Sequence, residues 1–129
     1  MNKKILIVSA NYYKDISSAL FKSALRLIPK KNKIKIINVP GVFEIPVTIS
    51  KNLKKFDAFL ALGCVIKGQT PHFDFISQAS TDAIMKLSIE SKKPIGNGII
   101  TCLNMKQAIA RKKKGAEAAS AILSVLSQK

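Results

Sequence analysis

The stretch Ala61-Leu-Gly-Cys-Val-Ile-Lys-Gly-Gln-Thr-Pro-His-Phe73 decides the fold. It continues an apolar run, 59–66, which lacks polar alternation and therefore predicts a strand that is buried on both faces. A loop with Gly68 follows the strand. Thr70 and Pro71 then form a helix-start signature, in which the hydroxyl caps the helix and proline takes the first position, where its missing N–H costs nothing. The stretch therefore predicts a strand, a short loop and a helix in direct succession.

The same pattern extends along the chain on both sides of this stretch. Apolar runs predict further strands at 5–9, 34–39 and 94–101, while the central strand covers 56–66. The expected helices are one capped by Ser17 or Ser18, one from 42 to 53, one from 71 to 91, and a helical region from 104 that the cluster 112–115 could divide. The alternation predicts one α/β domain, residues 1–129, in which helices sandwich a four-stranded parallel sheet.

The helical periodicity also predicts which side chains face the sheet. For the first helix they are Leu20, Ala24, Leu27 and Ile28, and for the third they are Phe75, Ile76, Ala79, Ala83 and Leu87.

Length and composition restrict the class of protein. A chain of 129 residues with 47% hydrophobic residues can bury a core, and no apolar run approaches the ~20 residues of a membrane span. The basic, apolar start resembles a signal peptide, but its apolar run is short and reads better as the first strand. Cys64 and Cys102 lie in strand patterns without metal-ligand spacing, and two buried thiols favour a reducing compartment, which we expect to be the cytoplasm.

The charge balance is strongly basic, with 22 Lys and Arg against 7 Asp and Glu and a net charge of +15. Such a charge could serve nucleic acid, an anionic substrate or an acidic surface. Only Arg26 and Arg111 are arginines, however, and aromatic residues do not alternate with the lysines as in single-strand binders. We therefore favour a solvated lysine surface and expect no nucleic-acid or membrane partner. A nucleic-acid binder is the alternative, and it would bind oligonucleotides with strong salt dependence.

Three loops at the carboxyl ends of the predicted strands carry candidate site residues. In parallel sheets ligands bind beyond these ends. Tyr12 follows the first strand, Glu44 the second, and Thr70 and His72 the third. The helix that starts at Thr70 offers free N–H groups to an anion, and a neutral imidazole at His72 could accept a proton. Taken alone, Tyr12 could be a surface aromatic, Glu44 a carboxylate that serves the start of a helix, and His72 a capping or surface residue. Their convergence at one end of the sheet favours a site.

Asn97 stands apart from these loops, near the start of the fourth predicted strand. That position is at the opposite end of the sheet, so a ligand contact of Asn97 would belong to the site of a neighbouring subunit. A glycine-flanked residue within a strand otherwise indicates a bulge or a close backbone approach.

Three motifs carry a family resemblance that covers nearly the whole chain. They are Val39-Pro-Gly-Val-Phe-Glu-Ile-Pro46, Gly63-Cys-Val-Ile-Lys-Gly-Gln-Thr-Pro-His-Phe73, and Gly98-Ile-Ile-Thr101 with the later Gln107-Ala108. In this order the chain resembles the 6,7-dimethyl-8-ribityllumazine synthase family of riboflavin biosynthesis. The resemblance implies a flavodoxin-like α/β/α sandwich and homopentamers, which in some members build larger shells, with active sites between adjacent subunits. It also implies a condensation of 5-amino-6-(D-ribitylamino)uracil with 3,4-dihydroxy-2-butanone 4-phosphate without cofactor or metal.

The resemblance also implies roles for individual residues. His72 would transfer protons, Tyr12 would stack on the pyrimidinedione ring, and Arg111 would face the phosphate from the neighbouring subunit. The ribityl chain would contact Val42, Phe43 and Glu44, and the uracil would contact Cys64, Val65 and Ile66. The neighbouring subunit would add Asn97 and Lys114. The phosphate loop would contain Gln69 and Thr70.

The chain departs from the family pattern at several of these places. Asn11 replaces a common arginine, Tyr12 a phenylalanine or tryptophan, and Gln69 a frequent glutamate; Lys67 stands where arginine is frequent. The segment from Arg111 to Lys114 is also short. A flavodoxin-like flavin- or nucleotide-binding module is the other alternative, but 10–13 lacks the glycine and hydroxyl residues of a phosphate loop.

Overall fold

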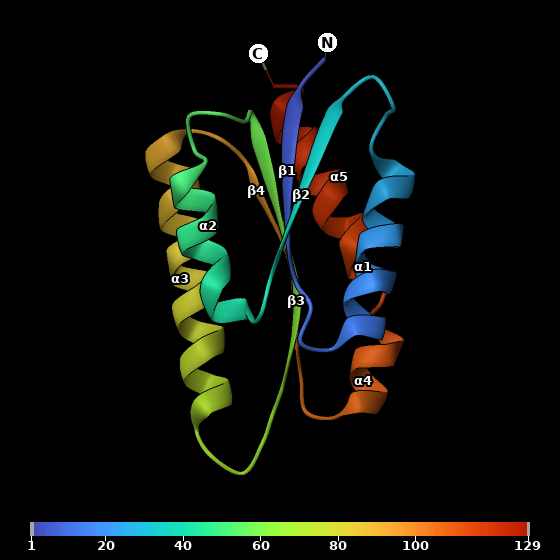
Figure 1. Cartoon of the computed structure of the whole chain (residues 1–129), viewed down its shortest axis with the longest axis vertical. Helices are drawn as coiled ribbons and strands as arrows, with labels where there is room; N and C mark the ends of the chain where they lie inside the picture. Colours follow the sequence, from blue (N-terminus) through green and yellow to red (C-terminus); the bar gives the residue numbers. More distant parts are fainter. Residues whose placement is uncertain (1, 129) are drawn as a thin grey trace.

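The computed structural model describes residues 2–128, which form one sheet of four parallel strands with helices on both faces (Figure 1). The strands lie in the order β2-β1-β3-β4. Their bounds are Lys4–Ala10 for β1, Lys33–Val39 for β2, Ala58–Ile66 for β3 and Ile95–Cys102 for β4. This is the arrangement of a flavodoxin-like fold, and the predicted three-layer α/β/α sandwich is confirmed.

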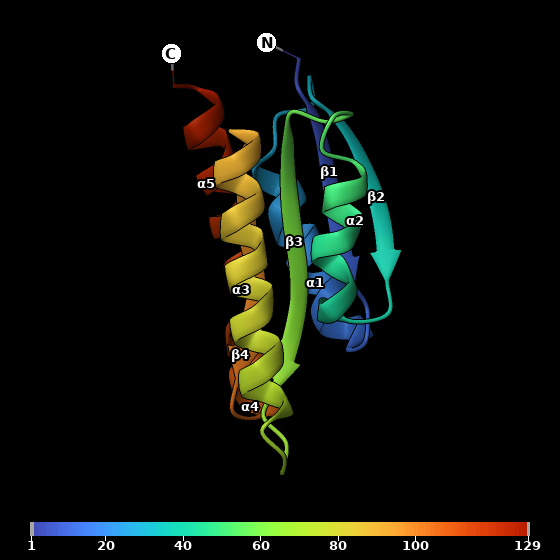
Figure 2. The ribbon, with the colours of Figure 1, turned by 90° about the vertical axis from the view of Figure 1, so that its left-hand side faces the viewer.

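Two hydrophobic clusters hold the layers together. On one face α1 (Lys14–Leu27), α4 (Met105–Ala110) and α5 (Lys114–Leu126) pack against the sheet, and on the other lie the short helix η1 (Val42–Glu44), α2 (Ile45–Lys51) and α3 (His72–Ser91). Figure 2 shows α2 and α3 side by side in front of the sheet. The central strand β3 sends Leu60 and Leu62 into the first cluster and Phe59 and Ala61 into the second. It is therefore buried on both faces, as its unbroken apolar run predicted.

The first helix begins earlier than the sequence predicted. Because α1 starts at Lys14, Ser17 and Ser18 lie inside the helix and neither is its cap. Ser17 is buried, and its hydroxyl donates a hydrogen bond to the carbonyl oxygen of Ala10 at the end of β1. Leu27, predicted to face the sheet, is exposed in the last turn.

The third helix turns only part of its predicted face to the sheet: Ile76 and Leu87 pack against the core cluster as expected. Ser80 and Ile84 are buried, and Ile76 packs beside them, whereas Phe75 and Ala79 are exposed. Apolar residues also occupy the outer side of this helix, so the spacing alone did not select one face. The cap prediction was also inaccurate: α3 starts at His72, and the Thr70 hydroxyl lies 3.4 Å from the His72 nitrogen, too far for a strong capping bond.

The glycines of β4 mark a close backbone approach and not a bulge. The pairing with β3 continues without interruption from Ile95 to Cys102. A Cβ atom on Gly96 would lie 2.5 Å from the carbonyl oxygen of Ala118 in α5. The absence of side chains therefore allows α5 to pack directly on the strand.

The last helical region is divided, as the sequence suggested, but the break is at 111–113 and not at Gly115. Asn104 caps α4 by accepting a hydrogen bond from the Gln107 nitrogen at 2.9 Å. Gly115 lies in the first turn of α5, where a Cβ atom would collide with the backbone carbonyl of Leu20 in α1. It serves helix packing and not helix termination.

Candidate active site

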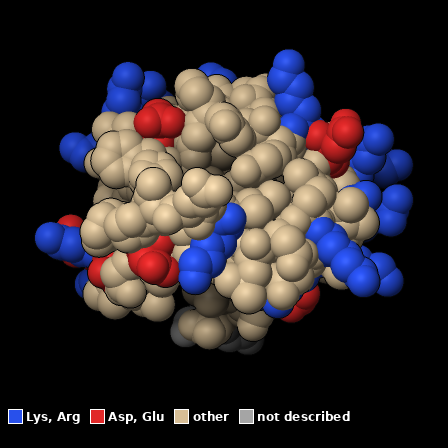
Figure 3. Space-filling view, turned by 90° about the horizontal axis from the view of Figure 1, so that it is seen from below, with Lys and Arg blue, Asp and Glu red and all other residues tan. Residues whose placement is uncertain are grey.

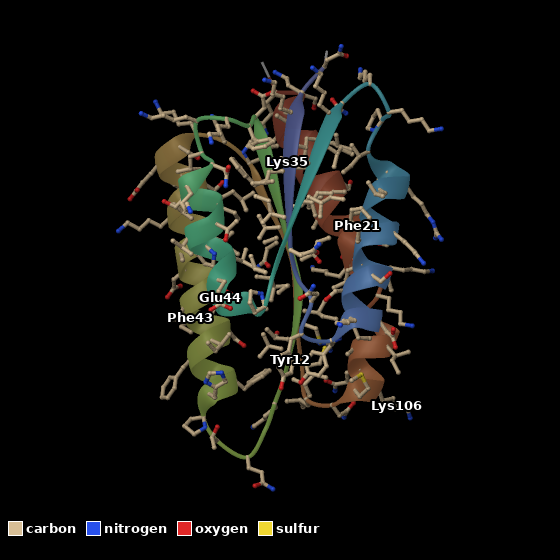
Figure 4. The ribbon with its side chains drawn as sticks, viewed as in Figure 1. Tyr12, Phe21, Lys35, Phe43, Glu44 and Lys106 are labelled. Carbon is tan, nitrogen blue, oxygen red and sulfur yellow. The ribbon has the colours of Figure 1, made fainter. Side chains whose placement is uncertain are left out.

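A cavity of about 630 Å³ opens at the carboxyl ends of β1, β2 and β3. Residues from all three of the loops that the sequence singled out line it, together with the end of β3 and the first turns of α3. Figure 4 shows Tyr12, Phe43 and Glu44 near this end of the sheet, on the loops after β1 and β2. The parallel topology brings the loops together because every strand ends at the same edge.

The loop after β1 contributes two tyrosines to the cavity. Tyr12 is 75% exposed, and its ring meets the ring of Tyr13 edge to face, with centroids 4.9 Å apart and an interplanar angle of 83°. Tyr13 is partly buried against the core cluster under α1. Burial raises the pKa of Tyr13 above its ordinary value, with smaller contributions from Tyr12 and Cys64. The sequence analysis did not assign Tyr13 to the site.

The loop after β2 holds its carboxylate in a defined position. The Gly41 nitrogen donates a hydrogen bond to Oε1 of Glu44 at 3.0 Å, and the Glu44 nitrogen donates to the Gly41 carbonyl at 3.2 Å. These two hydrogen bonds fix the turn before α2: the Glu44 carboxylate accepts as it does in a capping box, while the Gly41 backbone carbonyl takes the place of a capping side chain. The second carboxylate oxygen makes no hydrogen bond to another described residue. Beside it, Phe43 is 68% exposed and Val42 is buried against the sheet.

The end of β3 forms the floor of the cavity with Cys64, Val65 and Ile66. Cys64 is buried and free, like Cys102 on β4. Burial raises the pKa of Cys64 to about 12, and the neighbouring Cys102 thiol adds to the shift. The Cys64 thiol is therefore protonated near neutral pH and provides a small apolar surface, not a nucleophile.

The loop after β3 brings backbone donors and a base to the same cavity. Gly68, Thr70 and His72 line it, but Gln69 does not. Among the described residues, no partner accepts a hydrogen bond from the backbone nitrogens of Gly68, Gln69 or Thr70. The His72 side chain is exposed in the first turn of α3. This loop can therefore offer several N–H groups to an anion next to an imidazole.

The residues that the resemblance assigned to a neighbouring subunit lie outside the cavity. Asn97 pairs with Ala61, five positions before the end of β3 at Ile66, which is about 16 Å along the strand. Its Oδ1 accepts a hydrogen bond from the Ile99 nitrogen at 3.0 Å. Arg111 donates from Nη1 to the Thr101 carbonyl at 3.0 Å, at the carboxyl end of β4.

Two further polar side chains from the sequence analysis are also placed elsewhere. Nζ of Lys114 lies 3.8 Å from Oε1 of Glu117 in the first turn of α5. Asn11, which departs from the family pattern, borders a separate groove between α1 and the β1–β2 side of the sheet. Neither lines the cavity.

Four residues of the cavity wall were not among the predicted site residues: Tyr13, Gly41, Phe73 and Ile76, whereas Gly68 lies in the loop that the sequence predicted as an anion site. Phe73 and Ile76 share the inner side of α3, three residues apart, and that spacing was a usable signal. Gly41 and Gly68 belong to the loops already quoted and line the wall through their backbones. Tyr13 gave no signal because nothing in the sequence separates it from its neighbour Tyr12.

The charged side chains leave much of this end of the molecule uncovered. Figure 3 views the lower end of Figure 1 and shows Lys and Arg mainly around the edge, with uncharged atoms over most of the centre. Within residues 2–128, no cluster of three or more His, Cys, Asp and Glu side chains could hold a metal ion. None of the helices in that range is long and apolar enough to span a membrane.

The fold and the cavity together define a flavodoxin-like α/β domain whose cavity lies beyond the strand ends, where such folds bind ligands. The sequence profile of the 6,7-dimethyl-8-ribityllumazine synthases matches residues 2–129. A 6,7-dimethyl-8-ribityllumazine synthase of Bartonella bacilliformis is 42% identical over 120 residues, covering 89% of this chain and 79% of the relative. One from Bartonella tribocorum is 41% identical over 140 aligned positions, covering 100% of this chain and 93% of the relative. One from Rhodopseudomonas palustris is 40% identical, with 95% and 83% covered.

The chain belongs to the 6,7-dimethyl-8-ribityllumazine synthase family. It is an enzyme of the transferase class that acts on small molecules, with lumazine synthase activity in riboflavin biosynthesis.

Proposed function

We propose that the cavity condenses 5-amino-6-(D-ribitylamino)uracil with 3,4-dihydroxy-2-butanone 4-phosphate and releases phosphate and water. One observation carries the proposal for this site: Tyr12, Glu44 and His72, from three separate loops, line one cavity. They supply an aromatic face, a fixed carboxylate and a base. The reaction needs all three properties, because it binds a flat ring with a polyol chain and moves protons at each step.

The uracil substrate fits between the exposed ring of Tyr12 and the floor formed by the end of β3. Stacking on the aromatic face would orient the pyrimidinedione, and backbone groups at Val65 and Ile66 would bind its edge. The ribityl chain would extend toward the turn at 42–44. There the free carboxylate oxygen of Glu44 can accept hydrogen bonds from hydroxyls while the other oxygen holds the turn.

The phosphate of the second substrate fits the loop after β3. The backbone nitrogens of Gly68, Gln69 and Thr70 have no acceptor among residues 2–128, which supports this use, and the N-terminus of the 20-residue helix α3 adds its dipole. An arginine from a neighbouring copy, Arg111, would add a guanidinium to the donors of this loop, whose one charged side chain is Lys67. Holding the phosphate in this way makes it a better leaving group.

The condensation then proceeds by proton transfers between two substrates that the cavity holds in position. The 5-amino group of the uracil attacks the ketone, water leaves, and a Schiff base forms. Loss of a proton and of phosphate gives a second carbonyl, and the ribitylamino nitrogen closes the ring on it with loss of water. His72 would carry protons in these steps, and a general acid-base of this kind contributes about 10²- to 10⁴-fold. Holding two substrates together supplies much of the rest.

We further propose that the working form is a ring of identical chains, a pentamer, in which each site lies between two neighbours. The cavity is open to solvent, and two side chains of its wall, Tyr12 and Phe43, are exposed. The outer face of α3 also exposes Phe75 and Ile89, so α3 could bury an apolar surface against another copy. A neighbour would bring Asn97, Arg111 and Lys114 to the site. The free thiols Cys64 and Cys102 fit the cytoplasm as the compartment.

The test is to mix both substrates with the purified chain and to follow the absorbance of the lumazine and the release of phosphate. We expect the two to appear in equal amounts, and only when both substrates are present. Butanone without the phosphate group serves as the control for the anion loop and should give little product. A protein that binds lumazine or flavin but forms none would instead be a binding module, and the proposal would be wrong.

A further inference from the structure

We propose that Tyr13 is a positioning residue that holds the ring of Tyr12 in the orientation in which it stacks on the uracil substrate. This inference rests on the stacking role proposed above for Tyr12. Tyr13 acts through the neighbouring ring and not on the reacting atoms.

The exposed Tyr12 ring has little else to hold it. It is 75% exposed, and its hydroxyl makes no hydrogen bond to another described residue. Within residues 2–128, Tyr13 is its one aromatic neighbour, at a centroid distance of 4.9 Å and an angle of 83°. This edge-to-face geometry is one of the arrangements that aromatic rings prefer. Without it, the rotamers of a solvent-exposed tyrosine on a loop are separated by little energy.

Tyr13, by contrast, is anchored at both its ring and its backbone. The ring packs against the core cluster between α1 and the sheet, close to Cys64 at the end of β3. Its carbonyl oxygen accepts a hydrogen bond from the Ser17 nitrogen at 2.9 Å, and the Ser17 hydroxyl in turn binds the Ala10 carbonyl. The first hydrogen bond ties Tyr13 to α1, and the second ties it through Ser17 to the end of β1. A fixed ring beside a loosely held one is the arrangement expected of a positioning pair.

The first experiment separates orientation from chemistry. Tyr13→Leu removes the ring, while Tyr13→Phe keeps it and serves as the matched control. For Tyr13→Leu we expect the KM for the uracil substrate to rise about two- to tenfold, with kcat and the KM for the butanone phosphate nearly unchanged. Tyr13→Phe should behave like the parent chain. In a Tyr12→Ala background the further change Tyr13→Leu should have no added effect on this KM.

An equal effect of Tyr13→Leu in both backgrounds, or a fall in kcat with both KM values raised, would show a merely structural role and overturn the proposal. Thermal unfolding of each variant would accompany the kinetics, because Tyr13 also packs on the core.

The second experiment reads the position of the ring without any activity. The chain contains no tryptophan, so Tyr12→Trp introduces a single fluorescent indole at this position. Time-resolved anisotropy should show a restricted indole in this variant and a faster local rotation when Tyr13→Leu is added, but not with Tyr13→Phe. Equal local rotation in all three overturns the positioning role. If the rotation changes as expected while Tyr12→Ala leaves the uracil KM unaltered, the positioning holds and the stacking role of Tyr12 fails.

Discussion

The chain has one histidine, His72, and the structure leaves its side chain exposed on the cavity wall. We predict that His72→Ala lowers kcat by about 10²-fold or more while changing either KM much less, because a proton carrier acts mainly in the transition state. Steady-state kinetics with both substrates would measure this, and His72→Gln would control for lost volume. Turnover equal to the parent chain would assign catalysis to the loop and to positioning alone.

Cys64 gives a prediction about pH at the same scale. Its pKa is raised from 9.0 to about 12 by burial and by Cys102, so the folded state holds the proton more tightly than the unfolded state does. This group therefore favours folding below about pH 9, and that contribution is lost as the pH rises through 12.

We consequently expect iodoacetamide at pH 8 to alkylate Cys64 far more slowly in the folded chain than in urea, since only the thiolate reacts. Mass spectrometry of the digested protein would measure the modification at each cysteine. A folded-state rate close to the urea rate would contradict both the burial and the raised pKa.

At the scale of elements, the sequence predicted strands better than helix ends and helix faces. The run that became β3 has no polar interruption, so only a strand buried on both faces could contain it. The start of α1 was missed because its cap position, Tyr13, makes no side-chain capping bond. The inner face of α3 was predicted only in part, with Ile76 correct and Phe75 wrong, because Phe75 on the outer face is as apolar as Ile76 on the inner one.

The packing of α5 against α1 gives a sharper test of the elements. We predict that Gly115→Ala destabilises the protein by about 1–3 kcal/mol or more, since the new methyl group would meet the Leu20 carbonyl, which cannot move without shifting α1. Urea unfolding followed by circular dichroism would measure the change in the free energy of unfolding. Gly68→Ala is the matched control for stability, because a Cβ atom there meets nothing within 4 Å. Equal urea midpoints for Gly115→Ala and Gly68→Ala would show that α1 and α5 can move apart without a loss of stability, and the prediction would be wrong.

At the scale of the whole molecule, one chain brings together only part of the predicted site. Tyr12, Glu44, Thr70 and His72 were predictable because they follow strands that end at one edge. Whether Arg111 takes part in a site was not predictable in this way, because that would depend on how a second copy approaches. That approach is not encoded in any periodicity of a single chain.

We predict that His72→Ala and Arg111→Ala chains, each inactive alone, regain part of the activity when they are unfolded and refolded together. In a ring, one subunit lends one edge and receives the other, so some interfaces of a mixed ring combine an intact His72 with an intact Arg111. Lumazine formation by the mixture, against each variant refolded alone, is the measurement. Native mass spectrometry would verify that mixed rings form. Mixed rings without recovered activity would place the whole site within one subunit.

The open cavity has a consequence for how a cell would control this enzyme. In the ring proposed above a second copy completes the site, so we expect an isolated chain to synthesise nothing and the output to depend on how often chains meet. Near the dissociation midpoint of the ring, halving the supply of the chain would lower riboflavin production by more than half. Gene dosage would then act on flux more steeply than in proportion, and a plot of rate against protein concentration would curve upward.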